Sequence, residues 1–262
     1  MSLLNDILEK FLKLVFPERC ISCDKVLGDL NAFGLCDKCE SDAVFLDGKN
    51  RCRICSRPIA DGEILCKDCM VAKRPFSYNV SACVYSGSIK EAITDFKFRD
   101  HPEKHRSFGE IIISELKTAE FLEKVDVIVP VPLHEKRYFE RGYNQSGLIA
   151  KYICEKLELP YTEELIKVKD IKPQSSIKVS SERIENVKGA FKVRDKNAFR
   201  DKYVLIIDDI FTTGATLGEA SRVILSAGAK AVFTATIAVT GCKALEKDSF
   251  PDNDDNFLEQ NN

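Results

Sequence analysis

The sequence predicts an α/β fold, with a parallel sheet covered by helices on both faces. Residues 204–207 are four consecutive apolar residues, which is typical of a strand buried on both faces of a parallel sheet. Strand-like and helix-like segments alternate between residues 81 and 240, the pattern of a three-layer α/β domain. With 262 residues, 44% of them hydrophobic, the chain can form one such domain and a smaller second one.

The expected elements follow one another in a regular order. Strands are predicted at residues 82–85, 125–131, 203–207 and 231–239. Helices are predicted to begin at Ser88 and Asn144, and a third to cover residues 217–227. Pro75 interrupts the chain where a cysteine-rich region gives way to these elements. We therefore divide the chain into four parts: residues 1–16, an amphipathic helix; 17–75, a cysteine-rich module; 76–245, the α/β domain; and 246–262, an acidic tail.

The formal charge of −2 is unevenly distributed along the chain. Residues 246–262 contain six acidic residues and one lysine, a net of −5, so the remainder carries +3. This acidic, Asn-rich tail is expected to be disordered. A net charge of +3 is mild compared with that of a dedicated nucleic-acid binder, although residues 167–202 hold eleven Lys and Arg against five acidic residues.

The chain shows no membrane or export signal. No segment approaches the roughly 20 apolar residues that a membrane span needs. The segment 3–12 has one apolar helical face, but it carries Asp6 and Glu9 and lacks the basic start and cleavage site of a signal peptide. We expect an amphipathic docking helix at this position and a cytoplasmic protein.

Eight of the eleven cysteines form four Cys-x-x-Cys pairs, separated by 12, 12 and 10 residues. Two such pairs complete a tetrahedral zinc site of four sulfurs, which has no open position and is therefore structural. A disulfide scaffold is disfavoured because no export signal is present, and redox exchange does not need four evenly spaced pairs. We predict two structural Zn²⁺ ions in a double zinc ribbon, with the ligands Cys20, Cys23, Cys36 and Cys39 in one site and Cys52, Cys55, Cys66 and Cys69 in the other.

The sequence indicates less directly which two cysteine pairs share one zinc ion. Sequential pairing needs only short hairpins and keeps the loop-closure entropy small, whereas interleaved pairing would cross the connections. The residues after Cys23 and Cys55 are Asp24 and Ser56, at positions where zinc knuckles often carry glycine. Because Asp tolerates a positive φ more readily than Ser, we expect the second knuckle to be tighter or less regular than the first. The module is either a nucleic-acid or partner contact or simply a structural platform.

A candidate ligand site follows the strand at residues 203–207. Asp208 and Asp209 come where this strand is expected to end, and ligands bind beyond the carboxyl ends of parallel strands. Thr212, Thr213 and Thr216 offer hydroxyl donors to phosphate, and Gly214 lets the backbone approach it. The two carboxylates suit hydroxyl groups or a hydrated divalent cation. Together these groups predict a sugar-phosphate site.

A second loop follows the strand at residues 126–129. Its sequence Val-Pro-Val-Pro-Leu is stiffened by two prolines, and Lys136, Arg137 and Arg141 supply positive charge beyond it. The alternative is a basic surface turn that precedes a helix N-cap at Asn144. A third segment, residues 169–191, is polar, basic and long, as expected of a mobile lid over a reactive site.

Residues 204–216 resemble the 5-phosphoribosyl-1-diphosphate (PRPP) signature of type I phosphoribosyltransferases. The resemblance implies a type I phosphoribosyltransferase-like, Rossmann-like sheet that binds PRPP with Mg²⁺. It implies that Asp208 and Asp209 hold the ribose hydroxyls as the catalytic pair. The 5′-phosphate then lies on Thr212, Thr213, Gly214, Ala215 and Thr216. The departing pyrophosphate lies on the loop that contains Val131, Pro132, Arg137 and Arg141.

Residues 3 to about 240 resemble the ComF family of competence proteins. The resemblance is carried by the Cys-x-x-Cys pairs, Val-Pro-Val-Pro-Leu, Arg-Gly-Tyr-Asn-Gln, Lys-Pro-Gln, Arg-x-x-Asn-Val and the Asp-Asp loop. It implies a double zinc ribbon before a phosphoribosyltransferase-like domain. It also implies a role in handling incoming single-stranded DNA during natural transformation, together with other competence proteins.

The sequence does not distinguish between two functions. One is an enzyme that transfers or cleaves phosphoribosyl groups, whose acceptor the sequence does not identify. The other is a non-catalytic module that binds PRPP, a nucleotide or single-stranded DNA while linking to other competence proteins. For this second function, the basic residues along 167–202, with Lys97, Arg99, Lys104 and Arg106, follow a nucleic-acid backbone while Phe96, Phe98 and Phe108 stack on bases. The competing interpretation is that these aromatic residues line the core.

Overall fold

The computed structural model describes residues 17–28, 33–46, 50–171 and 180–242, with the side chains of 180 and 181 excepted. The predicted N-terminal helix and acidic tail lie outside these residues. So do residues 172–179 of the segment predicted to be a lid.

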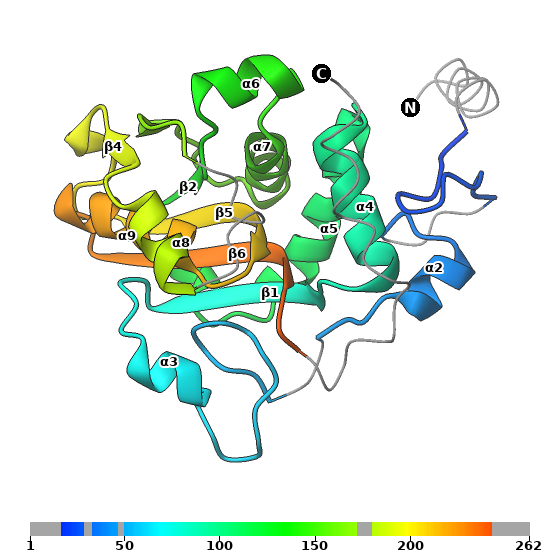
Figure 1. The fold of residues 1–262 in the computed structure, drawn as a ribbon, viewed down its shortest axis with the longest axis horizontal. Helices are drawn as coiled ribbons and strands as arrows, with labels where there is room; N and C mark the ends of the chain where they lie inside the picture. Colours follow the sequence, from blue (N-terminus) through cyan, green and yellow to red (C-terminus); the bar gives the residue numbers. More distant parts are fainter. Residues whose placement is uncertain (1–16, 29–32, 47–49, 172–179, 243–262) are drawn as a thin grey trace.

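A four-stranded parallel sheet forms the centre of the protein (Figure 1). Its strands, in spatial order, are β1 (Tyr78–Val84), β6 (Ala231–Val239), β5 (Tyr203–Phe211) and β2 (Val127–Pro130). Every neighbouring pair is parallel. The predicted α/β class is thereby confirmed. β1 begins four residues earlier than predicted, and β5 continues beyond Ile207 to Phe211.

Helices cover both faces of this sheet because alternate residues of each strand point in opposite directions. In β5, Leu205 and Ile207 belong to a core with α4 (Gly87–Phe98), α5 (His105–Leu116) and α7 (Gln145–Leu157). Val204 and Ile206 belong to a second core with α9 (Ala215–Ser226). All four β5 side chains are fully buried, and each such burial contributes about 1.5–3 kcal/mol.

Both edges of the sheet are covered by short extended segments. Beside β1, the Leu46 N–H donates to the Ala82 carbonyl, and the Val84 N–H donates to the Val44 carbonyl, each at 2.9 Å. Beside β2, the Ile128 N–H donates to the Pro160 carbonyl at 2.8 Å. Covered edges cannot pair with other chains, which protects a hydrophobic sheet from aggregation.

The remaining elements connect the sheet to the cysteine-rich module and to the surface. A two-stranded antiparallel sheet pairs β3 with β4. The bounds are α2 (Asp37–Asp42), α3 (Lys67–Val71), η1 (Pro102–Lys104), η2 (Leu122–Lys124), α6 (Glu135–Arg141), β3 (Leu165–Lys167), α8 (Ser180–Val187), β4 (Phe191–Val193) and η4 (Lys196–Ala198).

The stacking role predicted for residues 96–108 is wrong for two of its three aromatic residues. Phe96 and Phe108 have no exposed surface, and their rings pack against each other at 5.2 Å between centroids. Lys104 is also buried, and its ammonium group lies 3.1 Å from Asp95. The core interpretation therefore holds for Phe96 and Phe108, because the helical period places them on the inner faces of α4 and α5. Phe98 alone of the three is exposed, at 69%.

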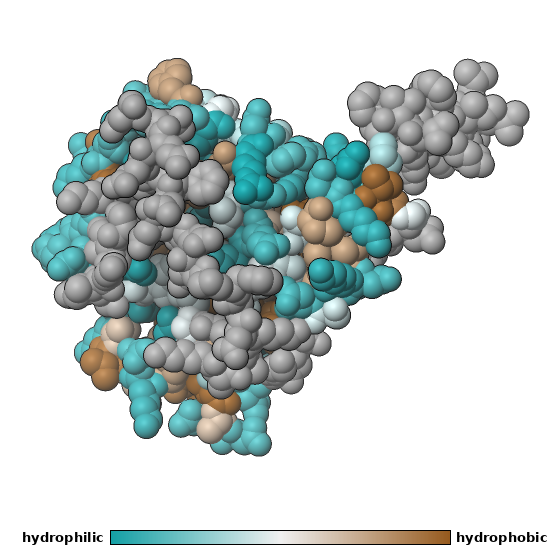
Figure 2. All heavy atoms as spheres, turned by 45° about the vertical axis from the view of Figure 1, so that its right-hand side comes forward, coloured by the Kyte–Doolittle hydropathy of each residue, from teal (hydrophilic) through white to brown (hydrophobic). Residues whose placement is uncertain are grey.

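The visible surface is mostly polar. On the face in Figure 2, hydrophilic side chains predominate among the described residues, and hydrophobic ones form small separate patches. Among the residues with described placement, no helix is both long and apolar enough to span a bilayer.

Candidate ligand site and metal centres

The eight paired cysteines form two clusters. Cys20, Cys23, Cys36 and Cys39 make the first and Cys52, Cys55, Cys66 and Cys69 the second, with the ligand atoms of each lying within 4.8 Å of one another. The pairing is therefore sequential, as the short connections favour. Four soft sulfur donors, without a carboxylate or imidazole among them, fit a closed tetrahedral Zn²⁺ site. Both clusters are structural zinc centres.

The two clusters repeat the same backbone design. In the first, the Cys20 N–H donates to the Lys25 carbonyl at 2.8 Å, and in the second the Cys52 N–H donates to the Arg57 carbonyl at 2.8 Å. Asp24 and Ser56 both adopt the left-handed region, with φ of 61° and 60°. The expectation of a less regular second knuckle is wrong. Ser56 is held in this conformation because its hydroxyl bonds to β1, as described below.

Each cluster packs into a different part of the α/β domain. Cys20, Cys36 and Cys39 are buried in the core that contains α4 and α5. Cys52, Cys55 and Cys69 are buried in the core that contains α9. Figure 1 shows the corresponding helices, α2 near α4 and α3 near the other end of β1. Zinc binding therefore stabilises packing in both cores. The remaining cysteines, Cys83, Cys154 and Cys242, are also buried, as predicted.

The acidic pair lies in the part of β5 that extends beyond the end of β2. β2 pairs with β5 only as far as Ile207, opposite Pro130, whereas β6 follows β5 to its end. Asp208 and Asp209 therefore lie just past the carboxyl end of β2, at an edge where parallel sheets bind ligands. The prediction that the acids come after the end of β5 is wrong in detail, because pairing with β6 continues the strand through both.

Each aspartate has a defined partner. The ammonium group of Lys97, at the end of α4, lies 2.8 Å from Asp209. The Ser146 hydroxyl, on the first turn of α7, donates to Asp208 at 3.0 Å, and the Asp209 N–H donates to the same oxygen at 2.9 Å. Burial, followed by the charge of Asp209, raises the pKa of Asp208 to about 7. Without a ligand, Asp208 is therefore partly protonated at neutral pH.

The loop after β5 ends in a left-handed glycine at the start of α9. Gly214 has φ of 72° and is the N-cap of α9, which starts at Ala215, two residues earlier than predicted. A Cβ at Gly214 would lie 2.6 Å from Cζ of Phe211, so only glycine fits. The Thr213 hydroxyl accepts a long bond from the Ala215 N–H at 3.4 Å. Residues 212–216 thus lie at the N-terminus of a twelve-residue helix, where backbone N–H groups lack intrahelical partners.

The second predicted loop is partly helical. Val131 is buried, and its N–H donates to the Ile207 carbonyl at 2.9 Å. Its own carbonyl accepts a bond from the Asn144 side chain at 3.1 Å, which fixes this turn next to β5. Beyond Pro132, the basic residues lie on the seven-residue helix α6 rather than on a loop. Arg137 and Arg141 are four residues apart and therefore share one face of α6.

The two arginines differ in their surroundings. The Arg137 guanidinium pairs with Glu140 at 2.9 Å and is partly exposed. The Arg141 guanidinium lies over the ring of Phe98, 5.1 Å from its centroid, and donates to Gln145 at 3.3 Å. Burial lowers the pKa of Arg141, and the charge of Asp209 opposes this effect. Arg141 is thus close enough to the acidic pair to interact with it.

Three side chains that interact with Asp208 or Asp209 were not among the site residues predicted from the sequence. Ser146 belongs to the Arg-Gly-Tyr-Asn-Gln-Ser segment, so its place at a predicted helix start was a usable signal. No sequence pattern placed Lys97 at this site, because only the folded structure brings the end of α4 close to β5. The third is Lys167, in β3. Burial lowers the pKa of its ammonium group, and the nearby charge of Asp208 partly opposes this effect.

Comparisons with known proteins agree with this organisation. Residues 11–70 match a family model described as "Double zinc ribbon domain". Residues 142–259 match a second family model, described as "Phosphoribosyl transferase domain". The chain is 31% identical to competence protein ComFC of Bacillus subtilis, over 74% of this chain and 79% of that protein. This chain belongs to the ComF family of competence proteins.

Two further relatives match over a larger share of the chain. Competence protein F of Haemophilus influenzae is 27% identical over 83% of this chain and 95% of its own length. DNA utilization protein YhgH of Escherichia coli is 28% identical over 84% of this chain and 96% of its own length. The fold is that of a phosphoribosyltransferase-like domain with an N-terminal double zinc ribbon.

Proposed function

We propose that this ComF-family protein binds PRPP with Mg²⁺ at the carboxyl edge of its sheet and acts on it during DNA uptake. The observation that carries this proposal is the position of Asp208 and Asp209 near the end of β5, a few residues before a left-handed glycine and a helix N-terminus. Carboxylates beside an anion cradle match a ligand that has hydroxyls at one end and a phosphate at the other. Among common metabolites, ribose phosphates have this arrangement.

The reaction that these groups support is displacement of pyrophosphate from the anomeric carbon of the ribose, where water or another acceptor forms the new bond. As the bond to pyrophosphate breaks, positive charge develops on the sugar and negative charge on the pyrophosphate. Asp208 and Asp209 hold the sugar hydroxyls, and residues 212–216 fix the 5′-phosphate. Arg137 and Arg141 lie on the face of α6 from which they stabilise the leaving group. Bound Mg²⁺ would supply further neutralisation of the negative charge that develops on the leaving group.

A second candidate function is binding of single-stranded DNA without catalysis. The observation that favours it is the exposure of three aromatic residues, at 69, 49 and 84%: Phe98, which lies under the Arg141 guanidinium, and Tyr138 and Phe139, which precede Arg141 on α6. Exposed rings beside cations are the usual platform for stacking bases of a single strand. The name of the Escherichia coli relative, DNA utilization protein, points in the same direction.

Calorimetric titration separates the two functions. PRPP is expected to bind with micromolar affinity in the presence of Mg²⁺ and at least tenfold more weakly without it. Released pyrophosphate, measured with and without candidate base acceptors, then reports turnover. Oligonucleotide binding that falls steeply with salt, in a protein that shows no heat with PRPP, would favour the DNA-binding function instead.

The raised pKa of Asp208 predicts a titration near neutrality. In the ligand-free protein, the carboxyl carbon of Asp208 should show an NMR titration midpoint near pH 7, and Asp209→Asn should lower it by removing the neighbouring charge. Because the folded protein retains a proton that the unfolded chain releases, this group's contribution to stability declines from about pH 4 to about pH 7. A midpoint near the ordinary value of 3.8 in both proteins would contradict the described burial.

A further inference from the structure

The knuckle of the second cysteine cluster reaches the candidate phosphate loop. Arg57 is the second residue after Cys55, and its guanidinium is only partly exposed, at 21% for the side chain. Its Nη2 donates to the Thr212 carbonyl at 3.0 Å, and its Nε donates to the Thr240 carbonyl at 2.8 Å. One side chain of the zinc module thereby binds the backbone of two loops, after β5 and after β6.

The chain is shaped to admit this guanidinium. Gly241 has φ of 80°, and a Cβ at that position would lie 3.2–3.4 Å from the guanidinium of Arg57. The third nitrogen, Nη1, lies 3.4 Å from Asp68, which stands between Cys66 and Cys69. Arg57 thus joins the two halves of the second cluster to the loop that begins at Thr212.

A second arginine approaches the same loop from the segment that follows the cluster. Arg74 lies over the ring of Phe211, 5.7 Å from its centroid. Its Nη1 would be 2.9 Å from a Cβ on Gly214, so the guanidinium lies directly beside the glycine of the loop. Within the described part of the chain, its buried Nε has no hydrogen-bond partner. The second cluster and the segment that follows it therefore place two positively charged side chains, Arg57 and Arg74, against residues 211–214.

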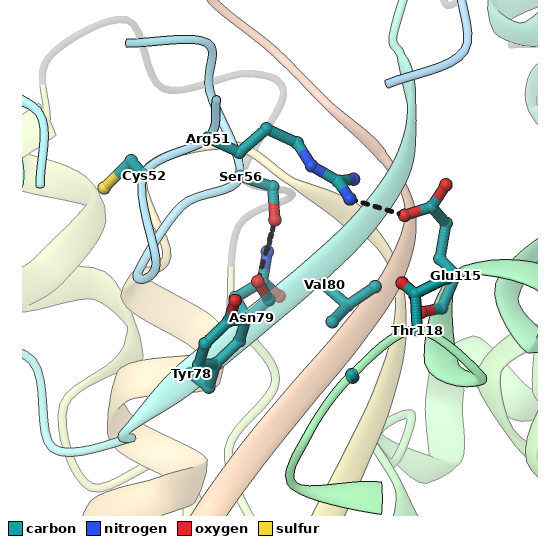
Figure 3. A pocket seen from close by; sticks show the side chains of 9 residues that line it. Arg51, Cys52, Ser56, Tyr78, Asn79, Val80, Glu115 and Thr118 are labelled. Carbon is teal, nitrogen blue, oxygen red and sulfur yellow. Dashed lines mark hydrogen bonds and ion pairs between the residues drawn. The ribbon is translucent and has the colours of Figure 1, made fainter. Parts of the chain in front are cut away.

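The knuckle that carries Arg57 is itself fixed to the sheet. Figure 3 shows Ser56 facing Asn79 of β1 beside a small cavity of about 100 Å³. The Ser56 hydroxyl donates to the Asn79 carbonyl at 2.8 Å and accepts from the Ser81 N–H at 2.9 Å. Nearby, Arg51 pairs with Glu115 of α5 at 2.7 Å. These bonds leave the base of Arg57 little freedom to move.

The first cluster provides an internal comparison. Lys25 occupies the position in the first knuckle that Arg57 occupies in the second, with the same backbone bond to the preceding cysteine pair. Lys25 is exposed, whereas Arg57 is largely enclosed. Two repeats of one knuckle thus carry different side chains at the same position, and only one of these side chains binds the loop of the α/β domain in the described structure.

We propose that the second zinc cluster is a fixed support for the phosphate loop, with Arg57 as the positioning residue, so that anion binding at residues 212–216 depends on this cluster. The inference rests on the proposed function for its ligand. An ordered loop has its amides already directed at the anion, so the ligand does not have to order them. Without Arg57, the Thr212 and Thr240 carbonyls lose a charged donor, and the loop loses its connection to the zinc module.

The test compares Arg57→Gln with the matched variant Lys25→Gln. In ligand-free protein, hydrogen exchange of the amides at residues 212–218 should be about tenfold faster in Arg57→Gln, and that of β1 and α5 should be unchanged. Affinity for PRPP with Mg²⁺ should fall about tenfold. Arg57→Lys should recover part of both losses, because one donor remains. Lys25→Gln should differ from the unchanged protein by less than about twofold in both measurements.

Zinc content is measured in every variant, and two equivalents are expected throughout because no cysteine is altered. The inference is overturned if Arg57→Gln, with both zinc ions bound, exchanges at residues 212–218 as the unchanged protein does. It is equally overturned if Lys25→Gln produces the same acceleration. The exchange measurement needs no ligand. Absence of PRPP binding to the unchanged protein would therefore refute the proposed function separately from the support role of Arg57.

Discussion

Replacing both acids, as Asp208→Asn with Asp209→Asn, is expected to weaken binding of PRPP and Mg²⁺ by at least 100-fold. Each carboxylate is predicted to accept charged or metal-assisted bonds, and a hydrogen bond to a charged group contributes about 1.5–3 kcal/mol. Two such losses correspond to roughly 10²–10⁴ in affinity. Isothermal titration calorimetry measures this change directly.

The same double variant should remain folded. Burial disfavours the charge of Asp208, and the two carboxylates repel each other, so asparagine relieves both effects. The loss of the pair between Lys97 and Asp209 opposes this gain, and we expect a change in Tm of only a few degrees. Asp201→Asn, at the opposite end of β5, is the control, because Asp201 is exposed and asparagine tolerates its φ of 58°. Unchanged PRPP affinity in the double variant would show that the acids do not hold the ligand.

Loss of one zinc ligand is expected to destabilise the whole protein. Cys36→Ser and Cys69→Ser should each remove about one equivalent of zinc and lower Tm by about 10 °C or more, because structural zinc contributes several kcal/mol. The effect should extend beyond the module because each cluster lies in a core shared with helices of the α/β domain. Differential scanning calorimetry and metal analysis provide the two measurements.

Cys154→Ser is the matched control for the zinc prediction. Cys154 is buried but belongs to neither cluster, so its replacement should leave two equivalents of zinc and change Tm much less. Metal-free protein with the Tm of the zinc-bound form would contradict a structural role for the clusters.

Local sequence patterns were enough to predict much of this architecture. The run at residues 204–207 identified the central strand, and the Cys-x-x-Cys spacing identified both metal clusters. These features depend on neighbours within a few residues or on short loops. The Gly214 turn was also visible, because a glycine between threonines and a predicted helix start is typical of a tight turn with a positive φ.

Features that depend on distant parts of the chain were not visible. Strand β5 continues through Asp208 because β6 remains beside it, and the sequence of β5 alone does not show this. Lys97 reaches Asp209, and Arg57 reaches Thr212, across 112 and 155 positions of the chain respectively. The aromatic residues of α4 and α5 were ambiguous because an alternating pattern of Phe and Lys fits both a stacking surface and a buried helix face.

A crystal structure of the protein with PRPP and Mg²⁺ tests the central claim most directly. The account predicts the 5′-phosphate on the amides of residues 212–216 and the ribose hydroxyls on Asp208 and Asp209. Density for the ligand elsewhere, with Lys97 still bound to Asp209 and the loop at Gly214 closed by Phe211 and Arg74, would contradict it.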